Sequence, residues 1–199
     1  NSFKYELGVD ANNNISFRTN YLLAISNNVS FLTDLRYAAP NYRAPYASNF
    51  GEQSFVSNEK GILTGIVFSK GNYYLSLFSD IYSTELSTFT TKHPVKGAQF
   101  FTDFRLKDGK QEYSFRLNYE RKSDSFTSDS INSKLTIPYD KINARFDINT
   151  NLGLGLRLRA RAEISYKLNE YTESETGNLF LLEIKKRDNN LNLYYGISF

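Results

Sequence analysis

Residues 153–168 read GLGLRLRARAEISYKL and divide into two interleaved series. One series is apolar: Leu154, Leu156, Leu158, Ala160, Ala162, Ile164, Tyr166 and Leu168. The other is charged or polar: Arg157, Arg159, Arg161, Glu163, Ser165 and Lys167. Because successive side chains of a β-strand point to opposite faces, this pattern predicts a long strand with one apolar face and one charged face.

The same alternation recurs along the whole chain, and no segment of a dozen residues shows a helical stripe. We therefore expect one all-β domain over 1–199. The predicted strands lie near 2–10, 14–26, 29–38, 60–70, 72–83, 97–107, 110–122, 133–149, 153–168, 178–187 and 190–199. Most have one apolar face, although the strands near 60–70 and 72–83 alternate less cleanly.

Short and long connections alternate between these strands. Gly, Asn and Asp, which tolerate the positive φ of hairpin turns, predict tight turns at 26–28, 70–72, 108–109, 150–152 and 188–189. Longer connections are expected near 39–59, 84–96, 123–132 and 169–177. Keeping polar residues on one face predicts that Lys107 opposes Lys110 and that Arg145 opposes Arg157, with Asp147 diagonal to Arg157.

Composition excludes several classes of protein. The chain has 199 residues, 40% of them hydrophobic, with 15 Tyr and 16 Phe, which argues against disorder. A net charge of +3 is too balanced for a nucleic-acid-binding surface, so no nucleic acid is expected as a partner. The absence of Cys excludes disulfides and thiolate chemistry, and no window of about 18 apolar residues predicts a membrane-spanning helix.

Two architectures fit the alternation: a soluble sandwich with its apolar face inward, or a transmembrane β-barrel with that face toward lipid. Several predicted strands reach ten residues or more, whereas strands of soluble sheets commonly have about five or six. Alternating short turns and long loops are typical of outer-membrane barrels and not of Greek-key sandwiches. We therefore favour an antiparallel up-and-down transmembrane β-barrel.

The ends of the chain indicate that this barrel is incomplete here. The chain starts at Asn1 and contains no Met, so we expect an internal or processed segment. The ending LNLYYGISF, up to Phe199, resembles the C-terminal assembly signal of outer-membrane barrels. However, about eleven strands is an odd number, whereas bacterial barrels usually have an even number, so further strands are expected outside this sequence.

Three motifs of residues 42–97 have a familiar form: Asn58-Glu59-Lys60-Gly61, the hairpin ending Phe78-Ser79-Asp80-Ile81-Tyr82, and Pro94-Val95-Lys96-Gly97. On these motifs, residues 42–83 resemble a region of large Bacteroidota outer-membrane proteins that carry helix-hairpin-helix repeats before a C-terminal barrel. The resemblance covers about 35–170, and it departs from relatives at Ser83-Thr84-Glu85-Leu86, where they tend to have Pro-Trp. It implies a barrel in the bacterial outer membrane and no defined activity, and the DNA-related repeats lie outside this chain.

The sharpest candidate site is a row of basic residues expected to line the barrel interior: Arg145, Arg157, Arg159, Arg161 and Lys167. A basic lumen would favour anionic solutes. The alternative, which we favour, is that carboxylates such as Asp147, Glu163 and Glu183 neutralise the row and give a salt-bridged interior.

A second candidate is the 39–59 connection, whose residue types are enriched at protein interfaces: Tyr42, Arg43, Tyr46, Phe50 and Phe55. It forms either an interface or a lid over the barrel mouth. His93 is expected to be a solvated loop residue and not a catalytic base, and Asp124 and Asp129 are expected to belong to a polar loop and not to a calcium site.

These observations predict a non-enzymatic outer-membrane protein, either a porin-like conduit in transport or a structural component of an envelope complex. The alternative class is a secreted or surface-exposed all-β binding or adhesion domain. Expected partners are outer-membrane lipid and lipopolysaccharide, with other outer-membrane proteins as further candidates. No cofactor, metal or catalytic residue is expected.

Overall fold

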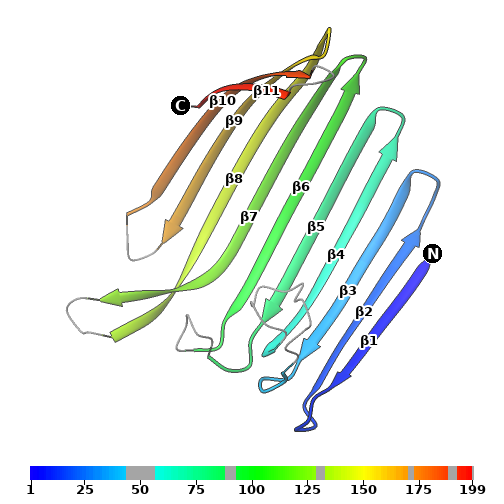
Figure 1. The fold of residues 1–199 in the computed structure, drawn as a ribbon. Helices are drawn as coiled ribbons and strands as arrows, with labels where there is room; N and C mark the ends of the chain where they lie inside the picture. The colour runs from blue at the N-terminus through cyan, green and yellow to red at the C-terminus, as the bar shows by residue number, and fades with distance from the viewer. Residues whose placement is uncertain (44–56, 88–92, 129–132, 170–172, 188–191, 199) are drawn as a thin grey trace.

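A computed structural model describes residues 1–43, 57–87, 93–128, 133–169, 173–187 and 192–198, and their side chains except at 124–128, 133–136, 187 and 192–198. These residues form one antiparallel sheet of eleven strands in sequence order (Figure 1). The strands are β1 (Ser2–Val9), β2 (Ile15–Ala24), β3 (Val29–Ala38), β4 (Glu59–Lys70), β5 (Tyr73–Ser83), β6 (Lys96–Asp108), β7 (Gln111–Ser128), β8 (Ser133–Gly153), β9 (Leu156–Asn169), β10 (Glu175–Arg187) and β11 (Asn192–Ser198).

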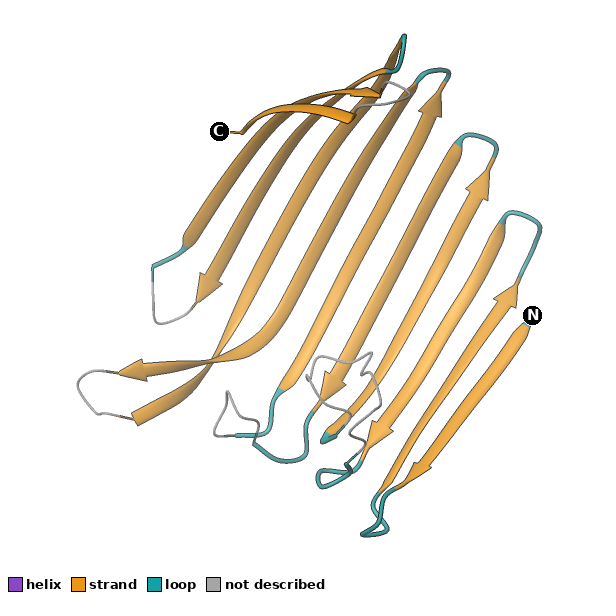
Figure 2. Cartoon of the chain, viewed as in Figure 1, coloured by secondary structure: helices purple, strands orange, loops and turns teal. Residues whose placement is uncertain are grey.

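The sheet is a single twisted layer, and Figure 2 shows strands and loops without a helix over the described residues. None of these residues forms a helix that is long and apolar enough to cross a membrane. The prediction of an all-β, antiparallel up-and-down arrangement is confirmed. The sheet is open, because β1 and β11 stand at its two ends.

The connections divide between two edges of the sheet (Figure 1). One edge, which we call the turn edge, joins β4 to β5 through residues 71–72 and β6 to β7 through 109–110. The opposite loop edge carries the long connections 39–58 and 84–95. The expected long connections 123–132 and 169–177 are wrong. β7 and β8 stay paired as far as Ser128 and Ser133 and leave only 129–132 between them, and β10 begins at Glu175 and leaves only 170–174 after β9.

The register aligns the two side-chain series of each strand with those of its neighbours, so that two continuous faces extend across the sheet. On one side, Phe17 lies opposite both Leu7 and Tyr37, and this face continues through the apolar residues of β3 to β10. We call it the apolar face. On the other side, Arg18 lies opposite Glu6 and Arg36, and this charged face continues to Glu183 of β10. The apolar series of residues 156–168 belongs to the apolar face, as predicted.

Burial is inverted relative to a soluble domain. Among the described residues Asp34 is the most buried, at 1% exposure, and Glu59 of β4 and Asp147 of β8 are also buried on the charged face. Large side chains of the apolar face are exposed, among them Tyr5 at 74% and Ile81 at 56%. Soluble proteins bury apolar side chains and almost never fully bury unpaired charges, so the described residues place their packed interior on the charged face.

Two predicted registers are wrong. Lys107 opposes Glu112 and not Lys110, because the two-residue turn is Gly109-Lys110, with Gly109 at a positive φ of 56°. Arg145 opposes Glu163 and not Arg157, so Asp147 lies opposite Arg161 and is not diagonal to Arg157. In that hairpin the expected turn residues 150–152 continue β8, the ladder shifts between Asn151 and Gly153, and positive φ angles occur at Gly153, Leu154 and Gly155.

Candidate functional site on the charged face

A buried ion-pair cluster on β3, β4 and β5 lies near the loop edge. The Arg36 guanidinium donates to Glu59 Oε1 at 2.6 Å and to both Asp80 oxygens at 2.8 and 3.0 Å. The three side chains are 9%, 4% and 14% exposed. Gly61 lies beneath the guanidinium, and a Cβ there would stand 2.6 Å from Arg36 Cζ. A glycine is therefore required for Arg36 to reach both carboxylates.

Aromatic rings of the same face lie over glycines of neighbouring strands. The Phe78 ring covers Gly65, its partner across β4 and β5, and the Tyr82 ring covers Gly97 of β6, so a Cβ on either glycine would overlap the ring. Phe78 also stacks on Phe101 of β6, with centroids 4.9 Å apart. These contacts explain why β4 and β5 alternate less cleanly: their second face also carries apolar groups.

The bases of the two long loops are joined by hydrogen bonds. Asn58, at a positive φ of 53°, accepts hydrogen bonds through Oδ1 from the backbone N–H groups of Glu85 and Leu86 at 3.0 and 2.8 Å. Its Nδ2 donates to the Leu86 carbonyl at 3.0 Å. Thr84 Oγ1 accepts from the Val95 N–H at 2.8 Å. The 39–58 and 84–95 connections therefore share a fixed, buried base.

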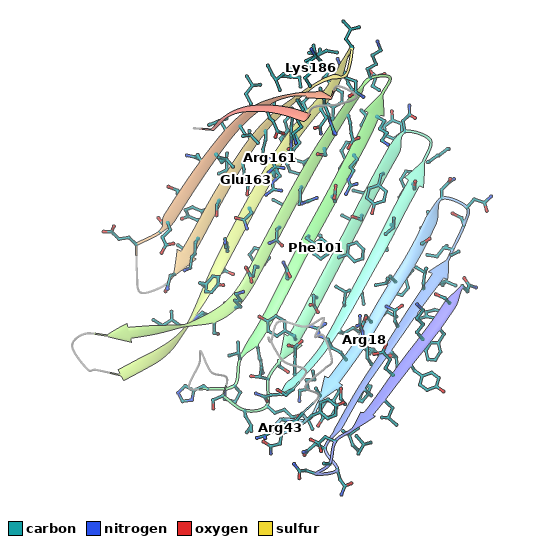
Figure 3. All side chains as sticks on the ribbon, in the orientation of Figure 1. Arg18, Arg43, Phe101, Arg161, Glu163 and Lys186 are labelled. Carbon is teal, nitrogen blue, oxygen red and sulfur yellow. The ribbon has the colours of Figure 1, made fainter. Side chains whose placement is uncertain are left out.

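Two further carboxylates are held by arginines on this face. Asp34 accepts from Arg18 Nε at 2.9 Å and from Asn20 Nδ2 at 3.3 Å. Asp103 pairs with Arg105 at 2.7 Å and with Arg116 at 3.1 Å. These groups lie on β2, β3, β6 and β7. Figure 3 draws the described side chains of β1 to β10 as sticks and labels Arg18, Phe101, Arg161 and Glu163 among them.

The predicted basic row lies on the charged face of β8 and β9, beside carboxylates. Arg145 pairs with Glu163 at 2.8 Å. Asp147 pairs with Arg159 at 3.0 Å and Arg161 at 2.7 Å.

In the centre of the row, Arg159 also reaches Glu183 of β10 at 4.0 Å, and Glu183 pairs with Lys185 at 3.0 Å. The two ends of the row on β9 have other surroundings. Arg157 is exposed near the turn edge, between Asn151 and Lys185 of the adjacent strands. Lys167 lies over the Tyr139 ring, with Nζ 4.9 Å from its centroid. That the row lines a lumen stays a prediction.

The predicted loop residues are only partly described. Tyr42 lies against Gly8 of β1, where a Cβ would overlap its hydroxyl group. The Arg43 backbone N–H donates to Asp10 Oδ2 at 3.1 Å. Tyr46, Phe50 and Phe55 lie outside the described residues, as does Asp129, and the Asp124 side chain is also not described.

The chemistry of this face is electrostatic. Ion pairs such as Arg36 with Glu59 and Arg145 with Glu163 recur along it and compensate much of its charge, while some like charges also lie opposite each other, as Arg116 and Arg145 do. His93 is exposed in the connection between β5 and β6. Over the described part of the chain, no group of three His, Asp or Glu side chains is placed to hold a metal ion.

No protein-family model and no curated protein matches this sequence. The resemblance to the Bacteroidota proteins therefore stays a prediction.

The three segments that carry this resemblance nevertheless meet in one place. Glu59 and Asp80 bind the same arginine, and Val95 joins the loop base to Thr84. Sequence analysis missed Arg36 as the common partner of Glu59 and Asp80. The sequence did contain a signal: Gly61 and Gly65 of β4 and Gly97 of β6 interrupt the polar series of their strands. Each of these glycines leaves space that a side chain of a neighbouring strand fills.

Proposed function

We propose that the chain forms part of a transmembrane β-barrel of the bacterial outer membrane, with the apolar face toward lipid and the charged face toward the interior. The observation that carries this proposal is the inverted burial: Asp34 is 1% exposed, whereas Tyr5 is 74% exposed. A soluble sandwich would need a second layer over the apolar face, and none of the described strands forms one.

The apolar face also has the height of a bilayer. On this face, the charged side chains of the described strand residues lie near the two edges: Lys60, Lys96, Arg121 and Asp140 toward the loop edge, and Lys70, Asp108 and Lys186 toward the turn edge. Nine residues separate Lys60 from Lys70, and eleven separate Lys96 from Asp108. A tilted strand needs about 9–11 residues to cross a bilayer.

Membrane insertion would require the outer strands β1 and β11 to be paired with further strands, because unpaired backbone groups are costly in hydrocarbon. β1 and β11 run in the same direction, since they are separated by nine strands of a fully antiparallel order. An antiparallel closure therefore needs an odd number of additional strands. By analogy with known barrels, the turn edge would face the periplasm and the loop edge the exterior.

Within this class, we propose a non-enzymatic role as a conduit or as a structural component of an envelope complex. The dense ion pairs of the charged face, such as Arg145 with Glu163, support a rigid, compensated interior and favour the structural role. Conductance in planar bilayers separates the two roles. A sealed barrel gives no channels, whereas defined conductance steps would establish the conduit.

Refolding tests the membrane assignment itself. We expect urea-unfolded protein to recover strand circular dichroism when it is diluted into detergent micelles or phospholipid vesicles, and to aggregate in buffer alone. A folded monomer in detergent-free buffer would overturn the proposal in favour of a secreted binding domain.

A further inference from the structure

A hollow of about 820 Å³ lies on the apolar face toward the loop edge. Its floor is built from side chains of β2 to β6: Phe17, Leu35, Tyr37, Ile62, Ile81 and Ala98. Phe17 and Tyr37 stack on each other with centroids 5.6 Å apart. Phe17 and Leu35 are 40% and 42% exposed. The floor is thus apolar, accessible and part of the surface proposed to face lipid.

Three cations of the apolar face, Lys60, Lys96 and Arg121, border this hollow on the side of the loop edge. Ser83 lies opposite both Lys60 and Lys96, so the three residues form a row across β4, β5 and β6. Since adjacent strands are about 4.8 Å apart, the two lysine backbones stand about 10 Å apart. Arg121 of β7 lies opposite Ala98, next to this row.

Lys60 and Arg121 are only weakly neutralised by the acids beside them. Lys60 Nζ is 3.5 Å from Glu85, and Arg121 Nε is 3.9 Å from Asp140. The Lys60 and Arg121 side chains are 55% and 61% exposed. The contrast with Arg36, which is 9% exposed and holds two carboxylates, shows that the border cations keep donors available for an external anion.

We infer that this hollow binds an anionic lipid whose headgroup carries phosphate monoesters, with its acyl chains on the apolar floor and a headgroup phosphate on Lys60, Lys96 and Arg121. The inference rests on the proposed barrel and its orientation, which would place the site in the outer leaflet. An anion-binding border directly above an exposed hydrocarbon floor matches the two halves of such a lipid. Exposed cations attract anionic headgroups at a membrane surface, and the floor adds the apolar contact that a free phosphate lacks.

Binding of diphosphoryl lipid A to the purified full chain in detergent tests this inference, with bound lipids counted by native mass spectrometry. The test variant is K60Q/K96Q/R121Q. The control K70Q/K110Q/K186Q removes the same charge at the turn edge. We expect one preferentially bound lipid A on the wild type and the control, and affinity weakened by about tenfold or more in the test variant.

Three outcomes would overturn the inference while leaving the barrel intact: equal loss in both variants, equal binding of phosphatidylcholine, or complete displacement of lipid A by inorganic phosphate. The last would assign the cations to a free anion. Far-ultraviolet circular dichroism of the same detergent samples measures their β-strand content and so tests the proposed fold separately. Failure to fold in detergent would overturn both proposals.

Discussion

Arg145 of β8 lies directly opposite Glu163 of β9, and its Nε donates to Glu163 Oε2 at 2.8 Å. The two side chains are 29% and 24% exposed, so the pair is partly shielded from water. Asp147 lies two residues further along β8 and holds Arg159 and Arg161. The row therefore stabilises the β8–β9 ladder through partners on both strands.

We expect E163Q to lower the free energy of unfolding by about 1 kcal/mol, because it leaves Arg145 without its charged partner. The control is E175Q, the same substitution at an exposed position on the same face of β10. Urea titrations followed by far-ultraviolet circular dichroism measure both. A double variant R145Q/E163Q should cost less than the sum of the single variants, and additive losses would show that the pair contributes nothing.

G65A should destabilise the protein by about 1–3 kcal/mol, because the added Cβ overlaps the Phe78 ring and overpacks the site. G177A is the matched control, since a Cβ there would meet only Ser165 Cβ, at 3.9 Å. The same urea titrations apply. Replacing the ring by the smaller leucine side chain in G65A/F78L should recover part of the lost unfolding free energy. Equal stability of G65A and G177A would contradict the stacked geometry.

L77R should cost about 2–4 kcal/mol of unfolding free energy in phospholipid vesicles, because Leu77 lies in the middle of β5 on the apolar face. Y73R, on the same face at the end of β5, should cost about 0–1 kcal/mol. Both residues are exposed, at 36% and 54%, so burial within the chain does not explain a difference. Equal costs would contradict a lipid-facing surface.

Asp10, in the connection between β1 and β2, should titrate below its usual range. Its carboxylate accepts from Asn14 Nδ2 at 2.9 Å, and then from the backbone N–H groups of Asn14 and Asn12 at 2.9 and 2.8 Å. These hydrogen bonds favour the charged form and lower the Asp10 pKa from 3.8. The stabilisation is therefore present above that value and is lost as the pH falls through the lowered pKa.

Carbon-detected NMR titration of the Asp10 carboxyl measures this directly. N14A should raise the Asp10 pKa toward its usual value, because it removes the side-chain donor. N12A keeps the backbone donor of residue 12 and should leave the pKa near that of the wild type. An unchanged Asp10 pKa in N14A would rule out the side-chain hydrogen bond as its main cause.

Sequence alone determined the approximate positions of the strands and their faces. The interleaved series of 153–168 and its equivalents needed only the two-residue period of an extended chain, so the all-β class, the antiparallel meander and the shared apolar face could all be predicted. The period also placed Arg145 and Arg161 on one face. The resemblance to barrel proteins and the function remain predictions.

Only the tertiary structure decided which residues meet. Shifting a strand by two residues preserves every face, so the pattern could not distinguish Arg157 from Glu163 as the partner of Arg145. Arg36 reaches carboxylates 23 and 44 residues away in the sequence. The need for glycine at position 65 follows only from the Phe78 ring that covers it. Local periodicity fixes the direction of a side chain, whereas pairing between strands depends on turns, shifts in the ladder and contacts far apart in the chain.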